Sequence, residues 1–215
     1  MSGAAGGPSL RVGILGGAFN PPHVGHLWLA QEAHARLGLD RVLLVPFGEA
    51  PHRTLDADPG AGERLRMAQL AAGDDDRLGV SAIEVDRPGP SYMADTLTLL
   101  REIEPATEPT LILGADQALR LPGWHEPERV LEQASLAVAD RDGHGRDDVV
   151  AALDGLVDAE AIAGFALPRI DVSSTLIRER IAAGLPIRYL VPDAVADRIA
   201  DRGHYASAAA REAAS

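Results

Sequence analysis

Two histidines at the expected start of a helix are the residues of this chain best suited to chemistry. Residues 16–27 read Gly-Gly-Ala-Phe-Asn-Pro-Pro-His-Val-Gly-His-Leu, which places His23 and His26 three positions apart. Side chains at that spacing share one face of a helix. A helix N-terminus attracts anions, and imidazoles can donate further hydrogen bonds to phosphate oxygens. Gly25 leaves room for close approach to the backbone, so the motif favours a phosphate site over a turn with packed histidines.

A second helix start, later in the chain, has the same character. Residues 171–178 read Asp-Val-Ser-Ser-Thr-Leu-Ile-Arg, so Ser173 or Ser174 can cap a helix and Arg178 follows one turn later. Arginine offers phosphate a permanently charged, bidentate contact. By itself this segment is equally well an ordinary capped helix, and its pairing with the first motif favours phosphate binding. The chain contains no lysine, so arginine, histidine and backbone amides must hold any anion.

The elements around these motifs alternate between short apolar runs and helical stretches. The expected strands are residues 12–15, 42–45, 80–85, 110–113, 136–139 and 165–167. The expected helices are residues 27–37, 63–72, 93–102, 117–121, 127–133, 149–156, 175–183 and 194–201, and residues 140–148 are expected to form a surface loop. This alternation predicts an α/β fold, with a single Rossmann-like, doubly wound parallel sheet and helices on both faces.

Polar residues follow five of the six expected strands. They are His23 and His26 after the first strand, residues 51–53 after the second, 88–92 after the third, 114–116 after the fourth and 173–175 after the sixth. Ligands of open α/β sheets bind beyond the carboxyl ends of the strands. The five loops therefore predict one active site at that edge of the sheet.

Composition limits the functions open to the chain. It has 215 residues and 46% hydrophobic content, enough for one sizeable core. We expect one domain over residues 10–205, flanked by flexible tails at 1–9 and 206–215. The absence of cysteine excludes disulfides and thiolate metal sites, and the net charge of -12 argues against nucleic-acid binding. No apolar run approaches a membrane span, and we expect a cytoplasmic protein that binds no membrane.

With these motifs the chain resembles the nucleotidyltransferase superfamily that carries a His-x-Gly-His signature. Within it, the chain is similar to the bacterial nicotinate mononucleotide adenylyltransferases over residues 11–205. The first motif and residues 173–178 mark the superfamily. Narrower features that mark the nicotinate branch are residues 51–53, the Arg87-x-Gly-Pro-Ser-Tyr92 segment with residues 95–97, residues 114–116, Trp124, Arg141 and residues 189–192.

The resemblance implies adenylyl transfer from ATP to nicotinate mononucleotide, giving deamido-NAD and pyrophosphate without a covalent enzyme intermediate. His23, His26 and Arg178 are the implied catalytic residues, with His26 nearest the α-phosphate. The residues implied to bind ATP are Gly16, Gly17, Phe19, Gly25, Ser173, Ser174, Thr175 and Arg178. Mg²⁺ would be coordinated by the triphosphate of ATP, since the sequence contains no acidic cluster that indicates a dedicated metal site. A homo-oligomer is left open.

The same resemblance implies a site for the mononucleotide. Its residues would be Arg53, Ser91, Tyr92, Gly114, Asp116, Trp124 and Arg141. Trp124 would stack on the nicotinate ring, and the Ser91-Tyr92 loop would recognise the ring carboxylate, largely through backbone N–H groups. The alternative role for Trp124 is packing at the surface. The alternative role for Asp116 is capping of the helix expected at 117–121. Four other histidines, His34, His125, His144 and His204, are expected at the surface.

Three residues depart from the family pattern. Asn20 stands where the family usually has Asp, Arg53 replaces a usual Lys, and Met93 replaces a usual Thr beside the expected nicotinate site. These departures leave adenylyl transfer intact and bear on the choice between carboxylate and carboxamide. The alternatives kept open are a related enzyme acting on nicotinamide mononucleotide or another phosphate ester, and a non-catalytic nucleotide-binding module. The absence of a Gly-x-Gly-x-x-Gly fingerprint disfavours a dehydrogenase.

Overall fold

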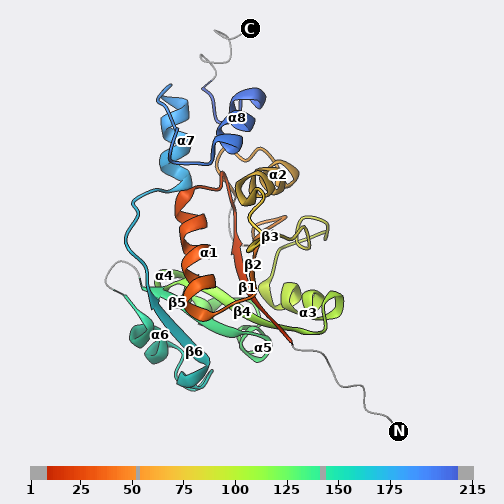
Figure 1. Ribbon diagram of the computed structural model, residues 1–215. Helices are drawn as coiled ribbons and strands as arrows, with labels where there is room; N and C mark the ends of the chain where they lie inside the picture. Colours follow the sequence, from red (N-terminus) through yellow and green to blue (C-terminus); the bar gives the residue numbers. More distant parts are fainter. Residues whose placement is uncertain (1–8, 52–53, 141–143, 208–215) are drawn as a thin grey trace.

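A six-stranded parallel sheet forms the centre of the molecule (Figure 1). The computed structural model describes residues 9–51, 54–140 and 144–207. The strands are β1 (Leu10–Gly17), β2 (Arg41–Pro46), β3 (Leu78–Val80), β4 (Thr107–Gly114), β5 (Ser135–Asp140) and β6 (Ile162–Ala166). Their order is β3-β2-β1-β4-β5-β6, so the direction of winding reverses between β1 and β4. The predicted doubly wound α/β sheet is confirmed.

Helices cover both faces of this sheet. They are α1 (Val24–Leu37), α2 (Ala61–Ala72), α3 (Met93–Ile103), α4 (Ala115–Ala118), α5 (Pro127–Gln133), α6 (Arg146–Ala152), α7 (Ser174–Ala182) and α8 (Asp193–Arg202), with short 3₁₀ turns η1 (Leu121–Gly123) and η2 (Ala159–Ala161). Gly38 ends α1 in the left-handed conformation, with φ 60°, and its N–H bonds to the His34 carbonyl. This is the cap that its position predicts.

Alternate residues of each strand pack against opposite helix layers. Val12 and Ile14 of β1 belong to the core cluster shared with α3 and α5. Ile112 of β4 belongs to the cluster on the other face, with α1 and α2. Gly13 stands between Val12 and Ile14 on β1 and faces Ile112. A Cβ at this position would come within 2.7 Å of the Ile112 side chain, so glycine is needed here. The period of two along the strands therefore builds one core on each face.

A third core joins α2, α7 and α8 at one end of the sheet (Figure 1). Met67, Ile177, Val195 and Ile199 are all buried there. Because these three helices pack together, the start of α7 lies next to the start of α1. The Ser174 hydroxyl donates to the Pro21 carbonyl oxygen over 2.7 Å, which joins segments 153 positions apart in the chain.

Arg64 of α2 is fully buried and holds the loops that follow β1 and β2. Its guanidinium donates to the carbonyls of Ala18, Phe47 and Gly48 at 3.1, 2.6 and 2.8 Å. Its Nε donates to an Asp58 carboxylate oxygen at 2.9 Å, which compensates the buried charge. Four acceptors from three loop segments are therefore satisfied by one side chain, and this fixes those loops against α2.

Several expected boundaries are wrong. The strand expected at 80–85 ends at Val80, and residues 83–85 form a turn in which Asp86 N–H bonds to the Ala82 carbonyl. The helix expected at 149–156 spans 146–152 and ends before Gly155, whose φ is 78°. The helix expected at 117–121 is α4, which begins at Ala115. The surface loop expected at 140–148 is shorter, since β5 includes Asp140 and α6 begins at Arg146.

Both expected tails fall almost entirely outside the described residues, so the division into a domain and two tails stays a prediction. Within the described ranges, no helix has the length and apolar character needed to cross a membrane.

Replacing Arg64 by alanine is expected to destabilise the protein by about 3–5 kcal/mol, because the change leaves buried carbonyls and the Asp58 carboxylate without their donor. Chemical denaturation monitored by circular dichroism measures this. Arg66→Ala is the matched control, since Arg66 lies on the same helix, is exposed and makes one 3.5 Å contact to Gln69. Equal stabilities of the two variants would contradict a central role for Arg64.

Candidate functional site

Two cavities lie side by side where the winding of the sheet reverses, at the carboxyl ends of β1 and β4. Their volumes are about 660 and 690 Å³. Gly16, Leu113 and Gln117 line both of them, so the cavities adjoin at the switch point. The first cavity is lined further by the segments after β5 and β6, and the second by those after β2 and β3. The predicted convergence of loops at this edge is confirmed among the described residues.

The first cavity contains both histidines of the sequence motif. His23 precedes α1 and His26 lies in its first turn, and their ring centroids are 3.7 Å apart. The His23 backbone N–H donates to His26 Nδ1 over 3.1 Å. Because Nδ1 accepts this bond, a neutral His26 ring carries its proton on Nε2, where it can be donated. A Cβ on Gly25 would lie 3.0 Å from the His23 ring, so this glycine makes room for the imidazole itself.

The start of α7 forms the next wall of the first cavity. Ser173 lines the cavity and caps α7, its hydroxyl accepting from the Leu176 N–H at 3.1 Å. Arg178 donates to the Asn20 carbonyl at 2.9 Å and to the Thr175 hydroxyl at 3.3 Å. These contacts orient the Arg178 guanidinium beside the loop that precedes the histidines.

Asn20 is buried and joins this loop to the end of the described chain. Its side chain accepts a 2.7 Å hydrogen bond from the Tyr205 hydroxyl and donates to the Asp56 carbonyl at 3.0 Å. Burial raises the pKa of the Tyr205 phenol, so this hydroxyl remains a donor. An aspartate at position 20 could not donate to the Asp56 carbonyl when ionised, so the amide fits its surroundings.

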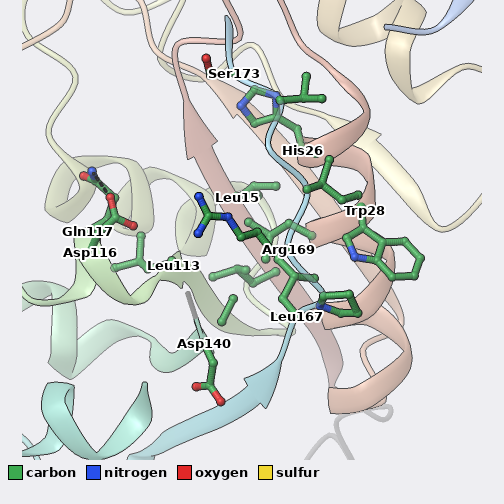
Figure 2. Close-up of a pocket in the computed structure, with 18 of the residues that line it drawn as sticks. Leu15, His26, Trp28, Leu113, Asp116, Gln117, Asp140, Leu167, Arg169 and Ser173 are labelled. Carbon is green, nitrogen blue, oxygen red and sulfur yellow. Dashed lines mark hydrogen bonds between the residues drawn. The ribbon is translucent and has the colours of Figure 1, made fainter. Parts of the chain in front are cut away.

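The opposite wall of the first cavity comes from the segment after β6 (Figure 2). Leu167 and Arg169 extend toward the side that carries Asp116 and Gln117, and Trp28 of α1 closes the wall behind them. Arg169 is held by Asp171, whose carboxylate accepts from its Nε at 2.6 Å. The sequence motifs did not identify Trp28 or Arg169, because each stands outside the polar clusters. Arg169 could have been found from its position just after the strand expected at 165–167, because ligands bind beyond the carboxyl ends of such strands.

The second cavity is walled by aromatic rings. Trp124 follows η1, and the rings of Tyr92 and His125 stack with centroids 4.1 Å apart. Met93, which begins α3, also lines this cavity, and its methyl group lies 3.0 Å from the position of a Cβ on Gly16. A flat ring can enter between such surfaces, since stacked aromatic side chains offer broad apolar faces.

The loop that carries Ser91 and Tyr92 is fixed from two sides. The Ser91 N–H bonds to the Glu49 carbonyl at 2.9 Å, and the Ser91 hydroxyl accepts from the Gly48 N–H at 3.0 Å. Arg87 donates to the carboxylate of Asp95 and to the Pro90 carbonyl, each at 3.0 Å. Beneath the loop, the almost fully buried Glu84 reaches the cavity wall.

The predicted site residues divide into three groups. Those that line a cavity are Gly16, Gly17, His23, Gly25, His26, Ser91, Tyr92, Gly114, Asp116, Trp124 and Ser173. Those that line neither cavity are Phe19, Ser174, Thr175 and Arg178. Arg53 and Arg141 lie outside the described residues. Asp116 lies in the first turn of α4 after the N-cap Gly114, so the alternative capping role is wrong, and Asp116 lines the first cavity.

The expected surface positions are confirmed for His125 and His144, which are exposed. His125 also stacks on Tyr92, and His144 lines the first cavity. His204 is half-buried and lies 3.3 Å from the Glu63 carboxylate, which also pairs with Arg198. Among the described residues, no group of three or more histidine, aspartate or glutamate side chains is arranged to hold a metal ion.

Comparison with known proteins agrees with this geometry. Residues 14–180 match the family model described as cytidylyltransferase-like. A probable nicotinate-nucleotide adenylyltransferase of Roseiflexus sp. (strain RS-1) is 44% identical over 199 residues, covering 92% of this chain and 98% of the relative. A protein of the same description from Chromohalobacter salexigens is 43% identical over 213 residues, covering 91% and 96%.

Solved structures share the fold. A nicotinic acid mononucleotide adenylyltransferase of Plasmodium falciparum, in complex with NaAD, has a TM-score of 0.72 at 15% identity and covers 91% of this chain and 97% of its own. A putative nicotinate-nucleotide adenylyltransferase of Vibrio parahaemolyticus has a TM-score of 0.63 at 20% identity, covering 91% and 95%. The sheet order, the paired cavities and the full-length matches lead to one assignment: the chain belongs to the cytidylyltransferase-like family, among the nicotinate-nucleotide adenylyltransferases.

Proposed function

We propose that this protein transfers the adenylyl group of ATP to nicotinate mononucleotide, releasing pyrophosphate and deamido-NAD. The observation that carries the proposal is the pair of cavities that adjoin at Gly16, one with histidines and a helix start, the other with aromatic walls. A two-substrate transfer needs such adjacent sites, because the reacting phosphates must meet. The full-length similarity to relatives described as nicotinate-nucleotide adenylyltransferases supports the same reaction.

ATP would occupy the first cavity. The start of α1 and the Nε2 donor of His26 suit the α-phosphate, and Ser173 suits the rest of the triphosphate. Arg178 does not line this cavity, and it would reach the outer phosphates by leaving, or by sharing, its contact to the Asn20 carbonyl. The motif glycines Gly16 and Gly17 would allow the phosphates to approach the backbone.

Nicotinate mononucleotide would occupy the second cavity. Its ring would stack on Trp124. The backbone N–H groups of Ser91 and Tyr92 bond to the Glu49 and Pro90 carbonyls, and would bind the ring carboxylate by leaving or sharing these contacts. Asp116 would contact the mononucleotide from the boundary of the two cavities. Roles for Arg53 and Arg141 remain predictions of the family resemblance.

The chemical step needs positioning more than proton transfer. A phosphate oxygen of the mononucleotide, already ionised at neutral pH, attacks the α-phosphorus of ATP. The new P–O bond forms as the bond between the α-phosphorus and the oxygen bridging to the β-phosphorus breaks, and pyrophosphate leaves with that oxygen. Hydrogen bonds from His26 and charge from Arg178 would stabilise negative charge that develops on these oxygens.

Mg²⁺ would enter this site bound to ATP. Among the described residues, the lining of the first cavity offers histidine, hydroxyl and backbone donors, with only Asp116 and Asp140 as carboxylates, so phosphate oxygens and water would supply the ligands of the ion. When bound, the ion neutralises charge on the triphosphate. The expected cytoplasmic setting and a homo-oligomer likewise stay predictions.

The proposal is tested by pyrophosphate release with ATP and Mg²⁺, comparing nicotinate mononucleotide with nicotinamide mononucleotide. We expect the acid to react faster, because the full-length relatives are described as nicotinate-nucleotide adenylyltransferases. Similar rates would show that Met93, in place of a hydroxyl residue, has relaxed the choice. No release with either compound would refute the reaction and favour another phosphate ester or a non-catalytic nucleotide binder.

Replacing His26 by alanine is expected to lower kcat by about 100- to 1,000-fold, since it removes a donor that acts on the reacting phosphate. Steady-state pyrophosphate release measures the loss. His34→Ala is the control, because His34 lies on the same helix and lines neither cavity. Turnover of the His26 variant within threefold of the control would place this imidazole outside the reaction.

Replacing Arg178 by alanine is expected to raise the KM for ATP by about tenfold or more, because a charge-assisted contact to phosphate is lost. The KM for the mononucleotide should change little. Arg202→Ala serves as the control, since Arg202 is exposed on α8. An unchanged KM for ATP in a folded Arg178 variant would remove this residue from the triphosphate site.

A further inference from the structure

The aromatic walls of the second cavity come from separate parts of the chain. Ser91 and Tyr92, here called the Tyr92 wall, belong to the segment after β3, whereas Gly123, Trp124 and His125, the Trp124 wall, follow β4 and η1. Since β2 and β1 lie between β3 and β4 in the sheet, the spacing of the walls depends on tertiary contacts. The Tyr92 and His125 rings, with centroids 4.1 Å apart, form a direct contact between the walls.

Asp95 of α3 is bound by two arginines, one associated with each wall. Its Oδ2 accepts from the Arg87 guanidinium at 3.0 Å, and its Oδ1 accepts from the Arg129 guanidinium of α5 at 3.4 Å. Asp95 lies in the first turn of α3, where the helix dipole also favours a carboxylate. It lines neither cavity, so any effect on the site passes through its partners.

Arg87 connects Asp95 to the Tyr92 wall. Besides Asp95, its guanidinium donates to the Pro90 carbonyl at 3.0 Å. Pro90 immediately precedes Ser91, and the Tyr92 N–H bonds to the same carbonyl at 3.2 Å. The base of this wall is therefore tied to Asp95 through one guanidinium.

Arg129 connects Asp95 to the Trp124 wall. Its guanidinium donates to the Glu126 carboxylate at 2.6 Å and to the Thr98 hydroxyl of α3 at 2.8 Å. Glu126 follows His125 directly and has a φ of 52°, a left-handed conformation that is unfavourable for a residue other than glycine. Such a conformation persists where surrounding contacts fix it, and the ion pair with Arg129 is one of these contacts. Arg129 therefore holds the point at which the chain turns from the wall into α5.

We propose that Asp95 is a positioning residue, which through Arg87 and Arg129 holds the Tyr92 wall and the Trp124 wall at the spacing that admits the ring of the mononucleotide. The proposal rests on the proposed function. Single exposed ion pairs contribute little, but here one carboxylate is shared by two arginines and each arginine has a further partner, so the contacts form a network with fixed geometry.

The test uses Asp95→Asn, which keeps the shape of the side chain but offers one acceptor oxygen in place of two. We expect the KM for nicotinate mononucleotide to rise about fivefold, with kcat and the KM for ATP changed less than about twofold, because the network contacts the walls of the second cavity alone. Steady-state pyrophosphate release measures these values. Glu102→Gln is the matched control, since Glu102 is exposed on the same helix. An unchanged KM for the mononucleotide, or an equal rise in both KM values, would overturn the proposal.

A double-mutant cycle tests whether Asp95 acts through Arg129. Arg129→Ala should raise the KM for the mononucleotide at least as much as Asp95→Asn, since it also releases Glu126. The variant with both changes should stay within about twofold of Arg129→Ala, because both changes break the same connection. Effects that multiply would show that the two residues act independently, and would contradict the proposed network.

Hydrogen exchange without substrate separates this proposal from the proposed function. The backbone amides of Ser91, Tyr92 and Trp124 bond to carbonyl groups, so opening of either wall exposes them to exchange. We expect Asp95→Asn to speed exchange about fivefold or more in peptides that span residues 88–93 and 121–127, and to leave α1 unchanged. Exchange equal to that of wild type and Glu102→Gln would overturn the proposal. Faster exchange, together with absence of turnover in wild type, would refute the proposed function and support the role of Asp95 in holding the walls.

Discussion

The buried guanidinium of Arg64 is the contact on which the site most depends. The loops after β1 and β2 leave the sheet at the switch point with carbonyl groups that no strand partners, and Arg64 satisfies three of them from α2. Asp58 supplies the compensating charge. The histidine motif and the wall of the second cavity both begin at these loops, so one side chain of a core helix sets the relative position of the two cavities.

The two cavities differ in chemistry because different strands supply their walls. The first collects the starts of α1 and α7, whose dipoles and hydroxyls favour anions. The second collects aromatic rings from the segments after β3 and β4, with one buried acid beneath them. Both arise from a common rule of parallel sheets, which bring the carboxyl ends of all strands to one edge.

Much of this was accessible from the sequence, because the motifs sit at helix starts and strand ends that local patterns define. The paired histidines, the Ser173 cap and the Gly38 cap depend on contacts within a few residues. Arg64 and Glu84 were not predicted, since their partners are distant in the chain and their residue types usually indicate exposure. The apolar residues around Glu84 suggested a strand, but the Asp86 N–H bonds to the Ala82 carbonyl and the segment forms a turn.

The adjacency of the cavities at Gly16 has a consequence for the end of the catalytic cycle. In the proposed reaction the adenylyl part of ATP is joined to the mononucleotide, and the product would then occupy both cavities at once. Its halves act as two linked ligands, so when one half dissociates the other keeps it at high effective concentration. Departure of the dinucleotide requires both halves to detach together, and the affinity that assembles the substrates also retains the product.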